Sequence, residues 1–341
     1  MPQTDSIPQA FRAAALATAE ALRGIDRVVV AAHVNPDGDA AGSLAAAGHI
    51  LKALGKEHAL VSTTGLPQYL AFFPMPSAVH ESTGHLPFTP QAALLLDCGE
   101  PYRLGDETAA LVRDLPSVNI DPHVGEGMGS LANWVVPAAA ATAQLMAYAA
   151  LALDLPLSGG LADSVALGLI ADTGGFSHGN TTAEVFALCA ELSARGCSIH
   201  DLREKLDNCW TCGHMRLWGR LMQRVEVVRG GTVAWCPVSL RDLRECQARK
   251  EDLEGFVEVM RRLSGVRASV LVREDAPGCC KFSLRSTGAV DVRAAAAALG
   301  GGGHRNAAGG TMRLLLSDAC DKVLAAVDDR LTAEERAETD A

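Results

Sequence analysis

Aromatic residues are scarce in this sequence, at 4% of its 341 residues, and no apolar run reaches the length of a membrane span. The first residues, Met1-Pro2-Gln3-Thr4-Asp5, lack the basic segment and apolar stretch of a secretory signal. The tripeptide Gly-Lys-Ser/Thr does not occur, so a P-loop is excluded. These absences predict a cytoplasmic protein with no membrane partner.

A surplus of basic charge is also lacking, because the formal net charge is −10. Residues 1–222 hold 12 basic against 22 acidic side chains, residues 223–341 hold 18 of each, and within 261–313 nine basic side chains face three acidic ones. Long nucleic acids need an extended basic surface, so a protein that coats a long duplex is excluded. An acidic half suits cations and a local basic patch suits phosphate, which favours short RNA oligonucleotides or nucleotide phosphates as substrates.

The ten cysteines are scattered and form no small-domain disulfide framework. In a cytoplasmic protein most of them should be reduced thiols in the core. Cys209 and Cys212 have zinc-like spacing, but no second pair matches them. We therefore favour ordinary thiols at this pair and keep a zinc or redox role as the alternative.

Length predicts two domains, and a composition that is 48% hydrophobic and 21% charged supports a sizeable core. Short apolar runs alternate with Ala- and Leu-rich helical segments, which predicts an α/β protein with a mainly parallel sheet flanked by helices. The expected strands lie near residues 28–31, 60–62, 92–96 and 117–120, and the expected helices near residues 7–24, 40–54, 138–153 and 162–170.

The stretch from Val28 to Ser43 organises the N-terminal half. A β-branched run predicts a buried strand, and a helix follows after a break at proline and glycine. His33, Asp37 and Asp39 therefore lie on a strand-to-helix loop, where open α/β sheets bind ligands. A solvated Asp-Gly turn is the simpler interpretation. With histidine just upstream of two acids, we favour a metal site.

Three further apolar elements also end in an acid or a histidine: Asp97 follows one strand, Asp121 and His123 end another, and Asp172 ends a helix. Carboxylates that gather in this way indicate a shared site. A donor set rich in oxygen with some imidazole suits Mn²⁺, with Mg²⁺ as an alternative, better than zinc. Two ions held ~4 Å apart would activate water and stabilise a phosphoryl leaving group.

Five motifs carry a resemblance to the DHH phosphoesterase family, nearest to its members that degrade nanoRNA and dephosphorylate 3′-phosphoadenosine 5′-phosphate. They span about residues 10–325 in the expected order. The motifs are His33-Val34-Asn35-Pro36-Asp37-Gly38-Asp39-Ala40-Ala41-Gly42-Ser43, Leu96-Asp97, Ile120-Asp121-Pro122-His123, Ala171-Asp172-Thr173-Gly174 and Gly301-Gly302-Gly303-His304-Arg305-Asn306-Ala307-Ala308-Gly309.

The resemblance implies a centre of two manganese ions. Residue by residue, His33 and Asp37 would bind the first ion and Asp39 the second. Asp97 would bridge the two ions, and Asp172 would complete the first site.

The third family motif reads Asp-His-His, whereas this sequence has Asp121-Pro122-His123. Proline replaces the histidine that binds the second ion, and His123 matches the histidine that contacts the scissile phosphate. Three outcomes are open: water fills the gap at a weak second site, His123 moves across as a ligand, or catalysis is crippled. We expect a weaker second site with activity retained, because every other ligand position is filled.

The resemblance also implies a domain organisation. It places a DHH catalytic domain over residues 1–195, a linker over 196–222 and a smaller α/β substrate-binding domain, the DHH-associated domain, over 223–330. A polar tail, 331–341, is expected to fray. Family members form homodimers, so a homodimer is expected here.

In the C-terminal domain, Arg285 and His304 would hold the phosphate or nucleotide distant from the cut, through charge-assisted hydrogen bonds. Ser286, beside the arginine, would be a further contact to the substrate. Gly302 and Gly303 precede the histidine, and their run of glycines would offer free backbone amides to a phosphate.

The expected activity is metal-dependent hydrolysis of short oligoribonucleotides or of 3′-phosphoadenosine 5′-phosphate, with Asp39, Asp97 and His123 as catalytic residues. Arg103 would reach the phosphate, with a structural salt bridge as the alternative. A cyclic- or linear-dinucleotide phosphodiesterase and an inorganic pyrophosphatase are the enzymatic alternatives. A nucleotide-binding protein that lost catalysis through Pro122 is the alternative from another class.

Overall fold

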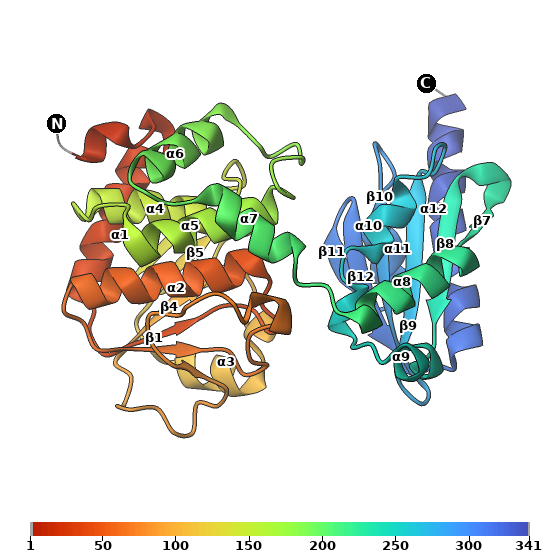
Figure 1. Ribbon diagram of the computed structural model, residues 1–341, viewed down its shortest axis with the longest axis horizontal. Helices are drawn as coiled ribbons and strands as arrows, with labels where there is room; N and C mark the ends of the chain where they lie inside the picture. The colour runs from red at the N-terminus through yellow and green to blue at the C-terminus, as the bar shows by residue number, and fades with distance from the viewer. Residues whose placement is uncertain (1–2, 340–341) are drawn as a thin grey trace. The chain divides into compact units, whose positions relative to one another are not determined.

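The computed structural model describes residues 3–339, which divide between Cys209 and Trp210 into an N-terminal and a C-terminal unit (Figure 1). The segment 196–222, where the sequence suggested a linker, holds the two helices α7 (Ile199–Asp207) and α8 (Cys212–Arg224), one in each unit. No described helix combines the length and apolarity that a membrane span requires.

The N-terminal unit contains a six-stranded sheet in the order β3-β2-β1-β4-β5-β6, and every neighbouring pair is parallel. This confirms the predicted parallel sheet, although the sequence had not indicated β3 or β6. The strands are β1 (Val28–Ala31), β2 (His58–Val61), β3 (Val79–His80), β4 (Ala92–Leu96), β5 (Ser117–Asp121) and β6 (Ala132–Val135).

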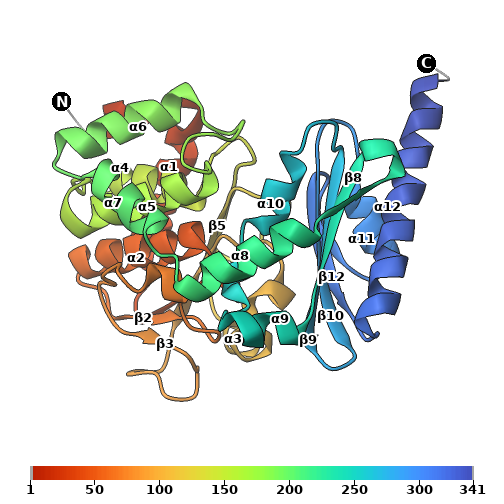
Figure 2. The same ribbon diagram turned by 45° about the vertical axis from the view of Figure 1, so that its right-hand side comes forward.

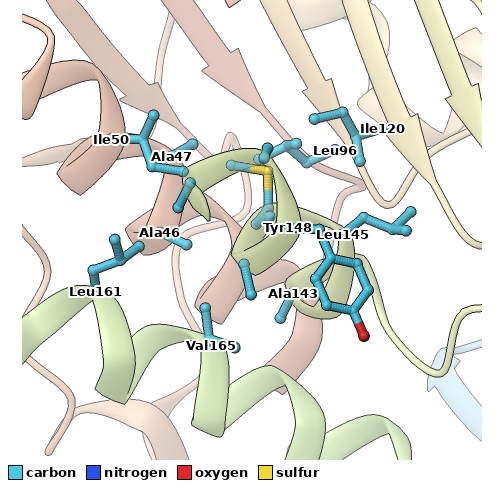
Figure 3. Close-up of a cluster of buried hydrophobic side chains, with 14 of the residues drawn as sticks. Ala46, Ala47, Ile50, Leu96, Ile120, Ala143, Leu145, Tyr148, Leu161 and Val165 are labelled. Carbon is cyan, nitrogen blue, oxygen red and sulfur yellow. The ribbon is translucent and has the colours of Figure 1, made fainter. Parts of the chain in front are cut away.

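Helices cover both faces of this sheet. The larger core joins one face to α1, α2, α4 and α5, and a smaller core joins the other face to α3. Figure 3 shows Leu96 and Ile120 of the strands near α4, with Ala46 of α2 and Val165 of α5 beyond. The helices are α1 (Gln9–Gly24), α2 (Gly38–Ala53), α3 (Asp106–Val112), α4 (Thr142–Ala152), α5 (Gly159–Asp172) and α6 (Ala183–Ala194), followed by α7.

Small residues bring α2 very close to α5. A Cβ added at Gly42 would lie 2.6 Å from the carbonyl oxygen of Ser164, and one at Gly168 would lie 2.5 Å from Oδ1 of Asp39. Neither position accepts a side chain without moving backbone or a buried carboxylate. This close packing is what carries the carboxylate of α2 into the interior beside α4 and α5.

The C-terminal unit has a second six-stranded sheet, in the order β11-β12-β10-β9-β8-β7, which is antiparallel except between β8 and β9. One core packs α11 and α12 against it, and another packs α8, α9 and α10 on its other face (Figure 2). The elements that follow α8 are β7 (Glu226–Val228), β8 (Val233–Val238), α9 (Leu240–Cys246), α10 (Phe256–Arg261), β9 (Ala268–Ala276), β10 (Cys279–Ser286), α11 (Val292–Ala298), β11 (Gly302–His304), β12 (Ala307–Met312) and α12 (Leu316–Thr339).

The C-terminal tail corrects one prediction. Residues from 331 onward were expected to fray, but α12 continues to Thr339. Leu331 is fully buried in the core of the unit. Arg229 pairs with Asp328 and, at 2.7 Å, with Glu335. Burial of Leu331 and these ion pairs stabilise the helix as far as Glu335.

Candidate metal centre

The predicted site residues of the N-terminal unit lie at the carboxyl edge of its parallel sheet. From β1 the chain proceeds outward through β2 and β3, then returns to β4 on the other side of β1 and continues through β5 to β6. Such a reversal opens a crevice beyond the carboxyl ends of the central strands. Asp97 directly follows β4, between the ends of β1 and β5. The topology therefore places this carboxylate at the middle of the site.

His33 and Asp37, on the loop after β1, face Asp97. Nε2 of His33 lies 3.3 Å from Oδ2 of Asp97 and 4.0 Å from Oδ2 of Asp37. Nδ1 of the same ring donates to the carbonyl oxygen of Val34 at 2.9 Å. A proton held on Nδ1 leaves Nε2 with its lone pair directed at the carboxylates in the neutral ring, which is how a histidine is prepared for a metal ion.

Asp37 has two separate functions in its two oxygens. Oδ1 accepts from the amides of Asp39 and Ala40, both at 3.0 Å, and so caps the N-terminus of α2. Oδ2 is the atom that faces His33. The sequence predicted this residue as a ligand, and the cap fixes the direction of the remaining oxygen.

The backbone of Asp97 is unusual, with a φ of 54° in the left-handed region. Such a conformation persists only when its surroundings hold it. Asn119 of β5 provides that support, because its side-chain amide donates to the carbonyl oxygens of Leu95 at 3.0 Å and Cys98 at 3.1 Å, on either side of Asp97. Asn119 is fully buried, and its place one residue before the motif Ile120-Asp121-Pro122-His123 was the only signal for it in the sequence.

A second group of possible ligands consists of Asp97, Asp121 and His123. Nδ1 of His123 lies 2.7 Å from Oδ1 of Asp121 and 3.4 Å from Oδ1 of Asp97. One ligand atom from each residue falls within 4.8 Å of the others, as also holds for His33, Asp37 and Asp97. The two groups share Asp97. Asp121 belongs to the third motif but was not among the predicted ligands.

Asp39 is placed differently from a simple ligand. Its carboxylate is buried, and its oxygens accept from the amides of Thr142 at 2.7 Å and Ala143 at 3.0 Å, at the N-terminus of α4. Ser43 donates to the same carboxylate at 3.3 Å. Asp39 is absent from the ligand groups found among the described residues, so its predicted role at the second ion stays a prediction.

The buried carboxylates of the site raise one another's pKa values, and this repulsion favours the binding of a cation. Burial, and then the charge of Asp97, raise the pKa of Asp172 to about 7. The same two causes raise the pKa of Asp39 well above its usual value, and Asp172 adds to them. Because a bound cation would relieve this repulsion, the donor set fits a divalent metal of the kind that prefers oxygen.

Asp172 is the last residue of α5. Its carbonyl oxygen accepts from the side-chain amide of Asn180 at 3.2 Å, and that amide also donates to Ala140 at 2.9 Å. Asn180 therefore ties the end of α5 to the turn before α4. No pattern in the sequence indicated this residue.

The surroundings of the two histidines of the site raise their pKa values and so favour their protonated forms. Burial acts to lower the pKa of His33, but the hydrogen bond and charge of Asp97 outweigh it and raise that pKa. The hydrogen bond to Asp121 is the largest cause that raises the pKa of His123. Arg103 acts on this group as well, because its charge lowers the pKa of both Asp97 and His123. The predicted phosphate contact by Arg103 stays a prediction.

In the C-terminal unit, Arg285 lies on β10, and its Nε is 2.6 Å from Oε1 of Glu258 on α10. The prediction for Ser286 is wrong. This residue is fully buried, it donates to the carbonyl oxygen of Val290 at 2.7 Å and it accepts from Asn306 at 2.8 Å. Successive strand residues point to opposite faces, so Ser286 lies on the face opposite the one on which Arg285 meets Glu258 of α10.

The glycine run forms a strand as well as a turn. Gly302 and Gly303 belong to β11, which is an edge strand and pairs with β12. Both glycines are exposed, and the unpaired edge of such a strand presents backbone amides. The backbone of His304 ends β11, but its side chain lies outside the described residues.

Two other patterns have structural explanations. The thiol of Cys209 donates to the carbonyl oxygen of Leu206 at 2.9 Å, and neither Cys209 nor Cys212 belongs to a possible ligand group in the part of the chain described. The other nine cysteines are free thiols. The sequence Gly175-Phe176-Ser177-His178-Gly179 matches a nucleophile-elbow pattern, but it follows a helix instead of a strand, and Ser177 donates to Gly174 at 2.7 Å.

Comparison with known proteins identifies the family. The model of the DHH family N-terminal domain matches residues 27–169, and that of the DHHA1 domain matches residues 238–333. The chain is 35% identical over 318 residues to the bifunctional oligoribonuclease and PAP phosphatase NrnA of Thermus thermophilus, which covers 92% of this chain and 93% of that protein. The chain belongs to the DHH family. Within the family it is of the NrnA type.

Solved structures agree with the DHH fold. An exopolyphosphatase-related protein from Bacteroides fragilis has a TM-score of 0.85 at 25% identity, covering 93% of this chain and 96% of that one. RecJ of Thermus thermophilus, solved in complex with Mn²⁺, has a TM-score of 0.51 at 17% identity and covers 95% of this chain and 55% of its own. The first likeness covers nearly the whole chain, including both units.

Proposed function

We propose that this DHH-family hydrolase is a metal-dependent phosphoesterase that cleaves short oligoribonucleotides and 3′-phosphoadenosine 5′-phosphate. One observation carries the proposal: two groups of possible ligands share Asp97 at the carboxyl edge of a parallel sheet. The NrnA relative, named as an oligoribonuclease and PAP phosphatase, supports the substrate class. Mn²⁺ is the proposed ion, and Mg²⁺ is the alternative.

Each residue of the site has a proposed role toward the cations. His33, Asp37 and Asp97 would hold one cation, while the carboxylates of Asp97 and Asp121 would offer a second position and leave His123 for the phosphoryl group. A divalent cation, when bound, supplies electrophilic activation of the phosphoryl group and of the attacking water. Asp172, with a pKa of about 7, would add negative charge as that cation displaces its proton.

The positive side chains of the site would bind the phosphoryl group. His123 has a raised pKa, and a protonated ring donates charge-assisted hydrogen bonds to phosphate. Arg103 lies close enough to act on Asp97 and His123. Charge that develops on phosphoryl oxygens would be stabilised by both groups.

The direct test is a steady-state assay of the full chain with the dinucleotide pApA and with 3′-phosphoadenosine 5′-phosphate. We expect mononucleotide or phosphate release that requires Mn²⁺ or Mg²⁺ and stops with chelator. Tight nucleotide binding without turnover would contradict the proposal and would favour a nucleotide-binding protein instead. Hydrolysis of cyclic or linear dinucleotides without hydrolysis of longer oligonucleotides would favour the alternative, a dinucleotide phosphodiesterase.

Pro122 offers a prediction about the second ion. Pro122→His restores a ligand type at the position where the family motif has histidine, so we expect the second Mn²⁺ to bind about tenfold more tightly. Calorimetric titration of metal-free protein measures this. Pro156→His is the matched control, because Pro156 is exposed and lies in the connection between α4 and α5, away from the carboxyl edge of the sheet. Equal binding curves for the two variants would contradict the prediction.

Arg285 offers a prediction about substrate binding. Removing its charge by Arg285→Ala should raise KM about tenfold and leave kcat nearly unchanged, because one charge-assisted hydrogen bond distant from the cut is lost. Arg293→Ala is the control, since Arg293 lies on α11 on the other face of the sheet. Initial rates over a range of pApA concentrations separate the two constants. A fall in kcat with unchanged KM would place Arg285 in the chemical step instead.

A further inference from the structure

The N-terminus of α4 has no capping side chain of its own. The preceding residue is Ala141, which has no polar side-chain atom. The first amides of the helix, those of Thr142 and Ala143, instead donate to the two oxygens of Asp39 at 2.7 and 3.0 Å. A carboxylate from α2 thus takes the place of the usual capping residue, and helix amides stabilise its negative charge.

Thr142 also contacts a second carboxylate. Its hydroxyl donates to Oδ1 of Asp97 at 3.1 Å. The side chain is fully buried, so water does not compete for this hydrogen bond. Through its amide and its hydroxyl, one residue joins Asp39 of α2 to Asp97 after β4.

The hydroxyl of Thr142 helps to fix the rotation of the Asp97 carboxylate. Thr142 contacts Oδ1, and His33 contacts the other oxygen, Oδ2, at 3.3 Å. Two contacts on opposite oxygens fix the rotation of a carboxylate group. Each oxygen keeps a lone pair for a cation, because an ionised carboxylate accepts at about four sites. The hydroxyl therefore sets which directions those lone pairs take.

We propose that Thr142 is a positioning residue for the cation centre, which orients the carboxylates of Asp39 and Asp97 together. The inference rests on the proposed function, because it requires that cations bind there. Residues that orient metal ligands in this way change affinity by about 10- to 100-fold when they are removed.

The experiment compares three substitutions at this position in the full chain. Thr142→Val keeps the shape and the backbone amide but removes the hydroxyl, Thr142→Ala removes it with a good helix former, and Thr142→Ser retains it. Thr18→Val is the matched control, because Thr18 is also buried but lies on α1. The readout is Mn²⁺ affinity by calorimetric titration, with the melting temperature in chelator measured alongside.

We expect Thr142→Val and Thr142→Ala to bind Mn²⁺ about tenfold or more weakly, and Thr142→Ser and Thr18→Val to bind like the unsubstituted protein. If Thr142→Val does not fold, the alanine and serine variants decide the matter. Unchanged affinity in the variants without a hydroxyl, or equal losses in the serine variant, would overturn the inference alone. Failure of the unsubstituted protein to bind Mn²⁺ would overturn the proposed function, and this inference with it.

Discussion

Replacing Asp97 by asparagine is expected to lower kcat on pApA by about a thousandfold or more. Asp97 is the one residue common to both groups of possible ligands. It is also the partner of His33, of His123 and of the hydroxyl of Thr142. Asparagine has nearly the same shape but offers one neutral oxygen, so both cation positions would lose a charged ligand.

The control for this substitution is Asp114→Asn, an exposed aspartate in the same unit. Rates are measured with saturating Mn²⁺ and again after further metal is added, which separates weak loading from a chemical defect. Circular dichroism establishes that each variant is folded. Retention of more than about a tenth of the rate by a folded Asp97→Asn variant would argue against a cation centre at this position.

The metal-free protein is expected to lose stability as the pH rises from 5 to 7. The pKa of Asp172 is about 7 in the folded protein, against an ordinary value of 3.8. A group whose folded pKa is raised contributes stability that is complete below the unfolded pKa and is lost as the pH rises through the folded pKa. The loss therefore falls between about pH 4 and pH 7.

Other groups in the site act in the same direction. The raised pKa values of His33 and His123 contribute stability that is lost as the pH rises above 6.5. The lowered pKa of Asp97 has the opposite sign, but it acts below pH 3.8 and so outside this range. Allowing for partial exposure of Asp172, we expect the free energy of unfolding to fall by about 2 kcal/mol between pH 5 and pH 7.

Urea unfolding at pH 5.5 and pH 7.5, in chelator and in Mn²⁺, measures this dependence. Cation binding favours ionised carboxylates, so Mn²⁺ should add more stability at the higher pH. Asp172→Asn should flatten the profile in chelator, whereas Asp154→Asn, at an exposed position, should leave it unchanged. A metal-free protein that becomes more stable over this range would contradict the assigned direction of the Asp172 shift.

The spacing of the motifs and the pattern of apolar runs predicted most of the fold of the N-terminal unit. Apolar runs ending in Asp97 and Asp121 indicated strands, and the Ala- and Leu-rich segment after Asp37 indicated the helix that became α2. Such patterns depend on neighbours within a few residues, so they are visible in the sequence. The edge strands β3, β6, β7 and β11 were missed because they are short and receive their order from pairing with another strand.

The sequence by itself determined the family, the parallel sheet and a set of acids and histidines placed at the ends of its elements. Only the tertiary structure decided how those side chains are held. Asp39 meets Thr142 across 103 positions of the chain, and Ser286 is buried while its neighbour Arg285 pairs with Glu258. The reason is physical: contacts between distant elements follow from which helix packs on which face, and a buried polar group takes whichever partner that packing provides.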